Sequence, residues 1–313
     1  MTLAFVFPGQ GSQAVGMGQD LAGAFATARH LFEEVDDALG QNLSRLMFEG
    51  PEDELILTEN AQPALMAVSM AVVRVLEKDC NITIPGKAAF VAGHSLGEYS
   101  ALAAAGALSL EDAARLLKLR GQSMQKAVPV GEGAMAALIG LEMDAAQTVA
   151  KAASEVGICA CANDNAPGQV VVSGATAAVE HAVEIAADHG AKRSVMLPVS
   201  APFHCPMMQP AADAMEEALS TTTISAPSVP LVANVTASQV GDPDEIRRLL
   251  VEQVTGMVRW RESVLYMKEQ QVDKLVEAGA GKVLTTLTRR IDREIIGKSL
   301  QTPADFDTVV KEI

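Results

Sequence analysis

Few aromatic side chains are available to build the core of this protein. The 313 residues include eight Phe, two Tyr and one Trp, so alanine-rich helices must do much of the packing. Hydrophobic residues make up 49% of the chain and charged residues 20%, the balance of an ordinary globular protein. A chain of this length can bury a substantial core, and it predicts one large domain or two unequal ones.

Cysteine and basic charge are also scarce, and each shortage excludes a class of protein. Of the four cysteines, only Cys159 and Cys161 are close in sequence, and a C-x-C is not a zinc-binding spacing by itself. We therefore expect free thiols and no metal site. The 24 Lys and Arg against 39 Asp and Glu give a formal net charge of −15, which disfavours nucleic acid and anionic membrane surfaces as partners.

Long apolar runs are missing as well. No run approaches the roughly 20 residues of a membrane span, and no signal peptide precedes the first predicted strand, which starts by Leu3. We therefore expect a reduced, cytoplasmic protein with no membrane partner.

The most informative stretch follows an apolar run at 88–92. It reads Gly-His-Ser-Leu-Gly over 93–97 and leads into a small-residue helix predicted over 99–107. Strand, sharp turn and helix are the setting that a G-x-S-x-G nucleophile elbow requires. Two glycines leave room for the reversal, and the amino end of the helix favours negative charge near Ser95. The pattern favours a nucleophilic Ser95 over an inert serine in a glycine-rich turn.

Hydrophobic patterning over 1–127 and 198–313 predicts the larger part of an α/β fold. Apolar runs are typical of buried parallel strands, and strands are expected at 3–7, 88–92, 230–236 and 272–277. Amphipathic patterns predict helices at about 20–39, 62–78, 109–127 and 244–257. One more helix is expected to end near 219, and another to begin after 281. Residues 44–60 look irregular.

Residues 128–197 have a different texture, bounded by Pro129 and Pro198. Strands are predicted at 133–140, 158–163, 169–174 and 192–197, with helices at 143–156 and 176–189. This β-α-β-β-α-β order is typical of a small ferredoxin-like subdomain inserted into the larger part.

Arg120 lies on the apolar face of the helix that follows the elbow. A guanidinium cannot lose its proton, and it is costly to bury without a partner. Spacing alone leaves open an internal ion pair, a side chain that extends to solvent, and a carboxylate on a ligand.

A serine hydroxyl is a weak nucleophile and needs a neighbouring base. Three of the five histidines lie in predicted amphipathic helices, and His94 should point away from the adjacent Ser95. His204 remains by elimination, in a proline-rich loop after the serine, where hydrolases of this architecture also place their histidine; a surface histidine is the alternative. The group that orients the imidazole could be an acid, a backbone carbonyl or an amide. These residues predict acyl transfer through a serine ester, with the acceptor left open.

Four motifs occur together in this chain: F-P-G-Q-G-S-Q at 7–13, G-H-S-L-G-E at 93–98, Arg120, and P-F-H at 202–204. In this order and spacing the chain resembles the malonyl-CoA:acyl-carrier-protein transacylases, the stand-alone enzymes of bacterial fatty acid synthesis. The resemblance covers essentially the whole chain. It implies a hydrolase-like parallel-sheet core with the ferredoxin-like insert. It also implies malonyl-CoA and acyl carrier protein as partners, no cofactor besides the coenzyme A thioester substrate, and a monomer.

The resemblance also implies roles for the catalytic positions. Ser95 matches the nucleophile and His204 the base. The backbone N–H groups of Gln10 and Leu96 match the oxyanion hole. The main-chain carbonyl of Gln253 matches the group that holds the histidine, so that a dyad replaces a triad.

Substrate-binding roles follow in the same way. Arg120 matches the residue that pairs with the free malonyl carboxylate, and His94 a second pocket histidine. Phe203 stands where many bacterial relatives have serine; in the related polyketide synthase domains, phenylalanine there goes with malonyl and serine with methylmalonyl units. The pocket asparagine of the family falls near 163–165 without a definite match.

The carrier protein of this pathway is strongly acidic, so docking on a chain of net charge −15 needs a local basic patch. The densest basic clusters are Arg259 with Arg261, and Arg289 and Arg290 with Arg293; Lys282 is close in sequence to the second.

Two other functions compete with this prediction. A serine hydrolase such as a thioesterase shares the elbow and the late histidine, but it does not explain Arg120 or the turn at 9–13. A non-catalytic subunit that binds carrier protein is the other, and the presence of Ser95, His204 and Arg120 together counts against it.

Overall fold

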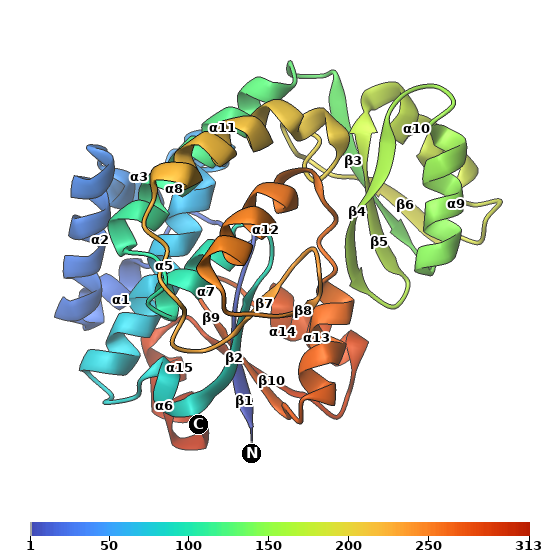
Figure 1. Cartoon of the computed structure of the whole chain (residues 1–313). Helices are drawn as coiled ribbons and strands as arrows, with labels where there is room; N and C mark the ends of the chain where they lie inside the picture. The colour runs from blue at the N-terminus through green and yellow to red at the C-terminus, as the bar shows by residue number, and fades with distance from the viewer. Residues whose placement is uncertain (1) are drawn as a thin grey trace.

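The computed structural model describes residues 2–313, which form two β-sheets (Figure 1). The larger sheet consists of β1 (Leu3–Phe7), β2 (Ala88–Gly93), β7 (Leu231–Ala233), β8 (Ser238–Val240), β9 (Lys274–Ala278) and β10 (Ile296–Leu300). Their spatial order is β10-β9-β1-β2-β7-β8, and every neighbouring pair is parallel except β7 with β8. The carboxyl ends of β1 and β2 therefore meet at one edge of the sheet, where the elbow begins.

The smaller sheet consists of β3 (Gly133–Ile139), β4 (Cys159–Ala166), β5 (Gln169–Ala175) and β6 (Arg193–Met196). Its order is β4-β5-β3-β6, with all neighbours antiparallel. Two helices, α9 (Met143–Ala153) and α10 (Thr176–Ile185), complete the ferredoxin-like β-α-β-β-α-β unit. The predicted fold class, a parallel-sheet α/β core with a small inserted antiparallel part, is confirmed.

Thirteen further α-helices accompany the larger sheet in residues 2–313. They are α1 (Gln19–Ala24), α2 (Ala26–Leu39), α3 (Leu43–Glu49), α4 (Glu52–Leu55), α5 (Thr58–Lys78), α6 (Ile84–Lys87), α7 (Gly97–Ala104), α8 (Leu110–Ala127), α11 (Gln209–Thr221), α12 (Pro243–Thr255), α13 (Trp260–Glu269), α14 (Val283–Ile291) and α15 (Pro303–Val309). No helix in the described part of the chain is both long enough and apolar enough to span a bilayer.

Strand β1 explains how helices cover both faces of the larger sheet. All five of its residues are buried, and their side chains alternate between two hydrophobic clusters. Phe5 and Phe7 pack into the cluster that contains side chains of α5, α7 and α8. Ala4 and Val6 pack into the cluster formed with α13 and α14. Complete burial of each phenylalanine contributes about 1.5–3 kcal/mol, so this alternation fixes the register of the central strand.

Several local predictions were wrong. The helix expected over 20–39 is divided at Phe25, whose backbone is extended, into α1 and α2. Residues 44–60 are not irregular, because α3 and α4 lie there; the Asn42 side chain caps α3 by accepting a hydrogen bond from the Arg45 N–H at 3.2 Å. The strand expected over 230–236 is shorter, since the chain turns back after Ala233 to form β8.

The inserted part is held against the core along β4. The Asp164 N–H donates to the Val258 carbonyl at 2.9 Å, and the Val258 N–H donates to the Ala162 carbonyl at 2.8 Å. Arg261 on α13 forms an ion pair with the buried Asp164 at 2.9 Å. These contacts fix the relative position of the two sheets, between which the candidate site lies.

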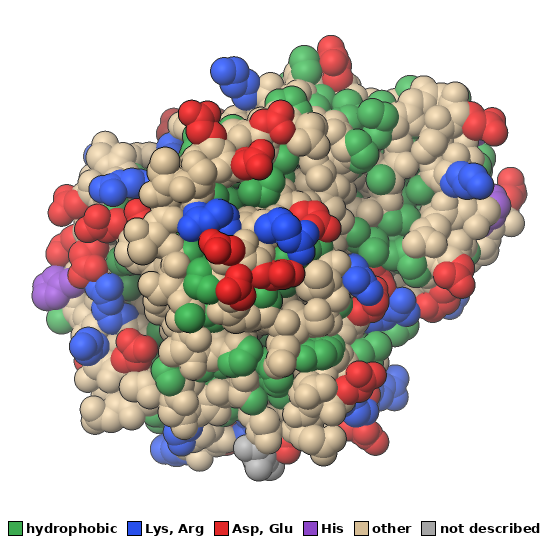
Figure 2. Space-filling view, in the orientation of Figure 1, with side chains coloured by type: hydrophobic (Ala, Val, Ile, Leu, Met, Phe, Trp, Pro, Cys, Tyr) green, Lys and Arg blue, Asp and Glu red, His purple; other side chains and the backbone are tan. Residues whose placement is uncertain are grey.

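The surface carries both signs of charge. Figure 2 shows acidic and basic side chains interspersed on the face in view, without a continuous basic stripe.

Candidate active site

Ser95 lies at the sharp turn between β2 and α7. Its φ of 53° is in the left-handed region, which costs energy for a residue with a side chain. The flanking glycines are required by space: a Cβ on Gly93 would lie 1.9 Å from the Gly97 backbone, and one on Gly97 would lie 2.3 Å from the Phe7 carbonyl oxygen. The Asn234 side chain, at the end of β7, accepts a hydrogen bond from the Ser95 N–H at 2.7 Å. The close packing at the two glycines and the hydrogen bond to Asn234 thus hold the strained turn in place.

The imidazole of His204 lies against this serine. Ser95 Oγ and His204 Nε2 are 2.7 Å apart. His204 Nδ1 is 2.9 Å from the Gln253 carbonyl oxygen and 3.1 Å from that of Gly256. Carbonyl oxygens only accept hydrogen bonds, so the proton belongs on Nδ1 and Nε2 is free to accept the serine proton. Of the three orienting groups that the sequence left open, the structure places backbone carbonyls here.

The surroundings keep His204 uncharged at neutral pH. Burial, followed by the positive charge of Arg120, lowers the pKa of His204 to about 3. A base must be unprotonated before it can accept a proton. The imidazole is therefore unprotonated at neutral pH and able to accept a proton.

The side chain of Arg120 extends from α8 to Ser95. Only 1% of it is exposed, so it does not extend to solvent. Its guanidinium donates to the side-chain oxygens of Gln62 and Gln253 at 2.8 Å each, and to Ser95 Oγ at 3.2 Å. Within residues 2–313 no acidic side chain lies within the 4.0 Å of an ion pair with Arg120. The buried charge is therefore hydrogen-bonded, but it forms no ion pair in the described part of the chain.

Two backbone N–H groups lie beside the serine without partners. Leu96 precedes α7, and Gln10 is in the loop after β1; both line the same cavity. In the part of the chain that the structure describes, neither N–H donates a hydrogen bond. A Cβ on Gly9 would lie 2.7 Å from the His94 carbonyl oxygen, so the loop backbone packs directly on the elbow. The arrangement can hold an oxyanion.

These groups face a cavity of about 520 Å³ that is lined by both parts of the fold. The core contributes the catalytic side chains and Phe203, which is 8% exposed. The inserted part contributes apolar side chains and Asn165, whose Oδ1 is 2.8 Å from His94 Nε2. Burial lowers the pKa of His94, so this second histidine is also neutral. Asn163 and Asn165 both line the cavity, within the range 163–165 where the sequence places the pocket asparagine, and Asn165 is the one in contact with His94.

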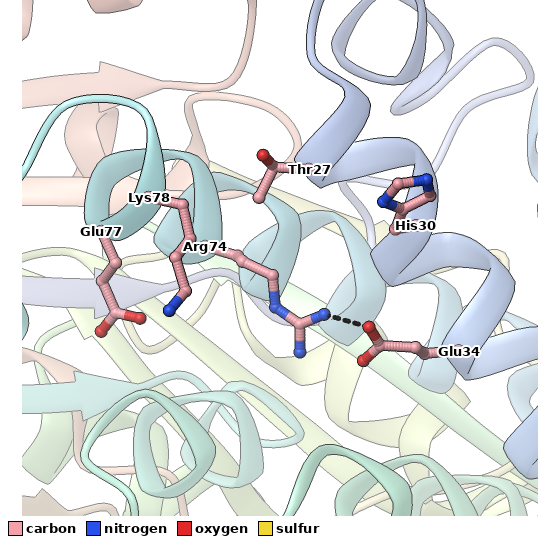
Figure 3. Close-up of a pocket in the computed structure, with 6 residues that line it drawn as sticks. All are labelled: Thr27, His30, Glu34, Arg74, Glu77 and Lys78. Atoms are coloured by element: carbon pink, nitrogen blue, oxygen red, sulfur yellow. Dashed lines mark hydrogen bonds and ion pairs between the residues drawn. The ribbon is translucent and has the colours of Figure 1, made fainter.

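A second hollow, of about 500 Å³, lies between α2 and α5 (Figure 3). It is lined by Thr27, His30, Glu34, Arg74, Glu77 and Lys78. Arg74 and Glu34 pair across it at 2.6 Å. It shares no residue with the cavity at Ser95 and contains no oriented nucleophile, so it is not a competing active site.

The structure brings together all eight residues singled out from the sequence: Gln10, His94, Ser95, Leu96, Arg120, Phe203, His204 and Gln253. Sequence reasoning missed three others. Gln62 lines the cavity, and Glu98 and Asn234 lie behind it. Of these only Asn234 had a signal, because it lies near the end of a predicted parallel strand, where site residues gather in α/β folds.

Comparison with known proteins shows that the chain has an acyltransferase fold. The acyl transferase domain family matches residues 4–299. The malonyl CoA-acyl carrier protein transacylase of Bacillus subtilis is 43% identical over 312 residues, which cover 99% of this chain and 97% of that protein. The crystal structure of acyl-carrier-protein-S-malonyltransferase from Bartonella henselae is 55% identical with a TM-score of 0.97, covering 100% and 99% of the two chains.

A second similar structure is a malonyl-transacylase in complex with its type II PKS acyl-carrier protein. It is 42% identical with a TM-score of 0.96 and full coverage of both chains. The chain therefore belongs to the acyl transferase family and, within it, to the malonyl CoA-acyl carrier protein transacylases.

Proposed function

We propose that this protein transfers the malonyl group of malonyl-CoA to the phosphopantetheine thiol of acyl carrier protein, through a malonyl ester of Ser95, and so supplies fatty acid synthesis. One observation carries the proposal: a hydrogen-bonded Ser95–His204 pair and a buried, un-neutralised Arg120 face one cavity. The pair supplies acyl transfer, and the cation selects an acyl group that ends in a carboxylate.

In the first half-reaction, Ser95 Oγ attacks the thioester carbonyl of malonyl-CoA while His204 Nε2 takes the hydroxyl proton. The Gln253 carbonyl holds the imidazole in the required tautomer. The N–H groups of Gln10 and Leu96 stabilise the oxyanion, and each such donor is typically worth about 2.7–4 kcal/mol. The intermediate collapses to the serine ester, and the departing coenzyme A thiolate takes the proton from His204.

In the second half-reaction, the thiol of the carrier protein's phosphopantetheine arm gives its proton to His204 and attacks the ester carbonyl. The same two N–H groups stabilise the oxyanion. Ser95 leaves and recovers a proton from His204, and malonyl carrier protein is released. No cofactor is needed besides the coenzyme A thioester itself.

Arg120 provides the selection between acyl groups. A guanidinium binds a carboxylate through two parallel hydrogen bonds, a geometry that lysine cannot copy. Acetyl-CoA offers no carboxylate, so the buried cation stays unpaired when it enters. We place Phe203 and His94 in the wall of the acyl pocket.

For the carrier protein we propose docking at α14, on Lys282, Arg289 and Arg290. Leu287 of this helix lines the cavity, and Arg290 donates a 2.6 Å hydrogen bond to Gln169 at its rim. The patch is thus beside the entrance that the phosphopantetheine arm must use.

The other basic cluster is less suitable. Arg259 is paired with Glu262, and Arg261 with Asp164. Those cations are already engaged within the chain. For the whole molecule we propose a cytoplasmic monomer, with 1–127 and 198–313 as the acyltransferase core and 128–197 as the small subdomain.

Intact-mass measurement after mixing with malonyl-, methylmalonyl- or acetyl-CoA tests the function. We expect a malonyl adduct on Ser95 that persists until holo carrier protein is added and then disappears as the carrier gains the group. Continuous release of coenzyme A with no adduct and no acylated carrier would instead identify a hydrolase. Absence of any reaction, with Ser95 also inert to a serine-directed phosphonate, would overturn the proposal.

A further inference from the structure

A buried carboxylate that the mechanism does not use lies behind the catalytic residues. Glu98 follows the elbow on α7 and is 1% exposed. It does not line the cavity, yet it accepts hydrogen bonds from the Gln253 side chain and, at 3.4 Å, from the Asn234 N–H. It therefore contacts two groups that hold the site, and neither of these contacts is with a reacting atom.

The Gln253 side chain connects Glu98 to Arg120. Its Nε2 donates to Glu98 and, at 3.0 Å, to the Ser95 carbonyl oxygen. Its Oε1 accepts from the Arg120 guanidinium at 2.8 Å. A carboxylate can only accept hydrogen bonds and a guanidinium can only donate them. Only one orientation of the amide satisfies both neighbours, with its nitrogen toward Glu98 and its oxygen toward Arg120.

The interposed amide also decides where the charge of Arg120 acts. The negative charge of Glu98 acts favourably on Arg120, but among the described residues the two side chains form no ion pair. A direct ion pair would occupy the hydrogen-bonding edge that a substrate carboxylate needs. Because one amide lies between them, Glu98 stabilises the buried Arg120 cation and leaves the free N–H groups of the guanidinium available to a ligand.

We infer that Glu98 is a positioning residue for malonyl recognition: it fixes the orientation of the Gln253 amide, and through it the guanidinium of Arg120. The role deepens the proposed function and rests on it. Neutralising Glu98 would make its side chain a donor as well as an acceptor, so the amide could turn and present its NH₂ group to Arg120. The guanidinium would then lose one of its two amide acceptors.

The variant Glu98→Gln keeps the size of the side chain and removes its charge. We expect the ratio of kcat/KM for malonyl-CoA to kcat/KM for acetyl-CoA to fall by about 10- to 100-fold, the effect of losing one hydrogen bond to a charged group. Labelling of Ser95 by a neutral phosphonate should change much less. As a matched control, Glu277→Gln alters another buried carboxylate, which accepts the N–H groups of Leu284 and Thr285, and should leave the ratio unchanged.

Two further readouts separate positioning from a general structural effect. In a Gln253→Met background the amide is absent, so adding Glu98→Gln should leave the malonyl-to-acetyl ratio nearly unchanged. Burial raises the pKa of Glu98 to about 7, and the titratable groups facing it are Arg120 on α8 and the adjacent Tyr99. The wild-type ratio should therefore decline as pH falls through about 7, and the decline should be absent in Glu98→Gln.

The outcomes are distinguishable from a failure of the proposed function. If the wild-type protein forms malonyl-Ser95 but Glu98→Gln lowers kcat/KM equally for malonyl-CoA and acetyl-CoA, Glu98 is only structural and this inference is overturned. Additive effects of Glu98→Gln and Gln253→Met on the malonyl-to-acetyl ratio would overturn the inference as well. If the wild-type protein forms no malonyl ester, the proposed function itself fails.

Discussion

Replacing Arg120 by alanine separates recognition of the malonyl carboxylate from the acyl-transfer chemistry. Arg120 is 1% exposed, and amide oxygens of Gln62 and Gln253 hold it at 2.8 Å each. Its desolvation has therefore occurred before the substrate arrives, and its geometry is already fixed. A malonyl carboxylate gains an oriented cation, whereas an acetyl group leaves that cation without a negatively charged partner.

The size of the effect follows from these contacts. Hydrogen bonds to charged groups contribute about 1.5–3 kcal/mol each, and a guanidinium–carboxylate pair forms two. Their loss amounts to about 3–6 kcal/mol, or a decrease of about 10²- to 10⁴-fold in kcat/KM for malonyl-CoA. Activity with acetyl-CoA should hold or rise, because the unpaired buried charge disappears with the side chain. Arg120→Lys keeps the charge but not the two-pronged geometry, so it should fall between wild type and alanine.

The assay is steady-state kcat/KM for both thioesters at a fixed concentration of carrier protein, together with intact-mass detection of the acyl-enzyme. Thermal unfolding establishes that the variant is folded. Parallel losses for malonyl-CoA and acetyl-CoA in a folded variant would show that Arg120 supports the structure of the site, and the carboxylate-binding role would be refuted.

Four further predictions concern the chemistry and the carrier. Ser95→Ala should abolish acyl-enzyme formation while the protein stays folded; a malonyl mass shift on this variant would contradict the nucleophile assignment. His204→Ala should lose most acylation rate but keep some, because the oxyanion hole remains, and an unchanged rate would move the base elsewhere. Because the pKa of His204 is lowered to about 3, it stays neutral above that value, and acetylation of wild-type Ser95 should show no ordinary histidine titration near pH 6.5; such a titration would argue against the buried base. Reversing Lys282, Arg289 and Arg290 to glutamate should raise KM for carrier protein, less so as salt is added, with KM for malonyl-CoA nearly unchanged; an unmoved carrier KM at low ionic strength would exclude this patch.

Much of the fold could be predicted because its signals are local. Continuous apolar runs marked the central strands, and the β-α-β-β-α-β order marked the inserted part. Some of the elements that were missed lack such signals: β8 has three residues, and β10 is a partly exposed edge strand. Helices α3 and α4 are short, so no long amphipathic pattern indicated them.

The sequence by itself predicted the residues that we propose carry the chemistry. The G-x-S-x-G spacing favours Ser95 as the nucleophile, elimination among the histidines leaves His204, and the apolar stripe makes Arg120 an exception that needs a partner. The predictions for Ser95 and Arg120 depend on neighbours within a turn or two of the chain, where spacing and backbone geometry are sufficient.

Only the tertiary structure decided how those residues are held. His204 and the Gln253 carbonyl are 49 positions apart in sequence, Arg120 and Gln253 are 133 apart, and Glu98 and Gln253 are 155 apart. Hydrogen bonds across such distances depend on the order of strands in the sheet and the packing of helices on it, which no local pattern encodes. Because a buried polar group is stable only when all its partners are in place, it is the folded core that turns a serine, a histidine and an arginine into one site.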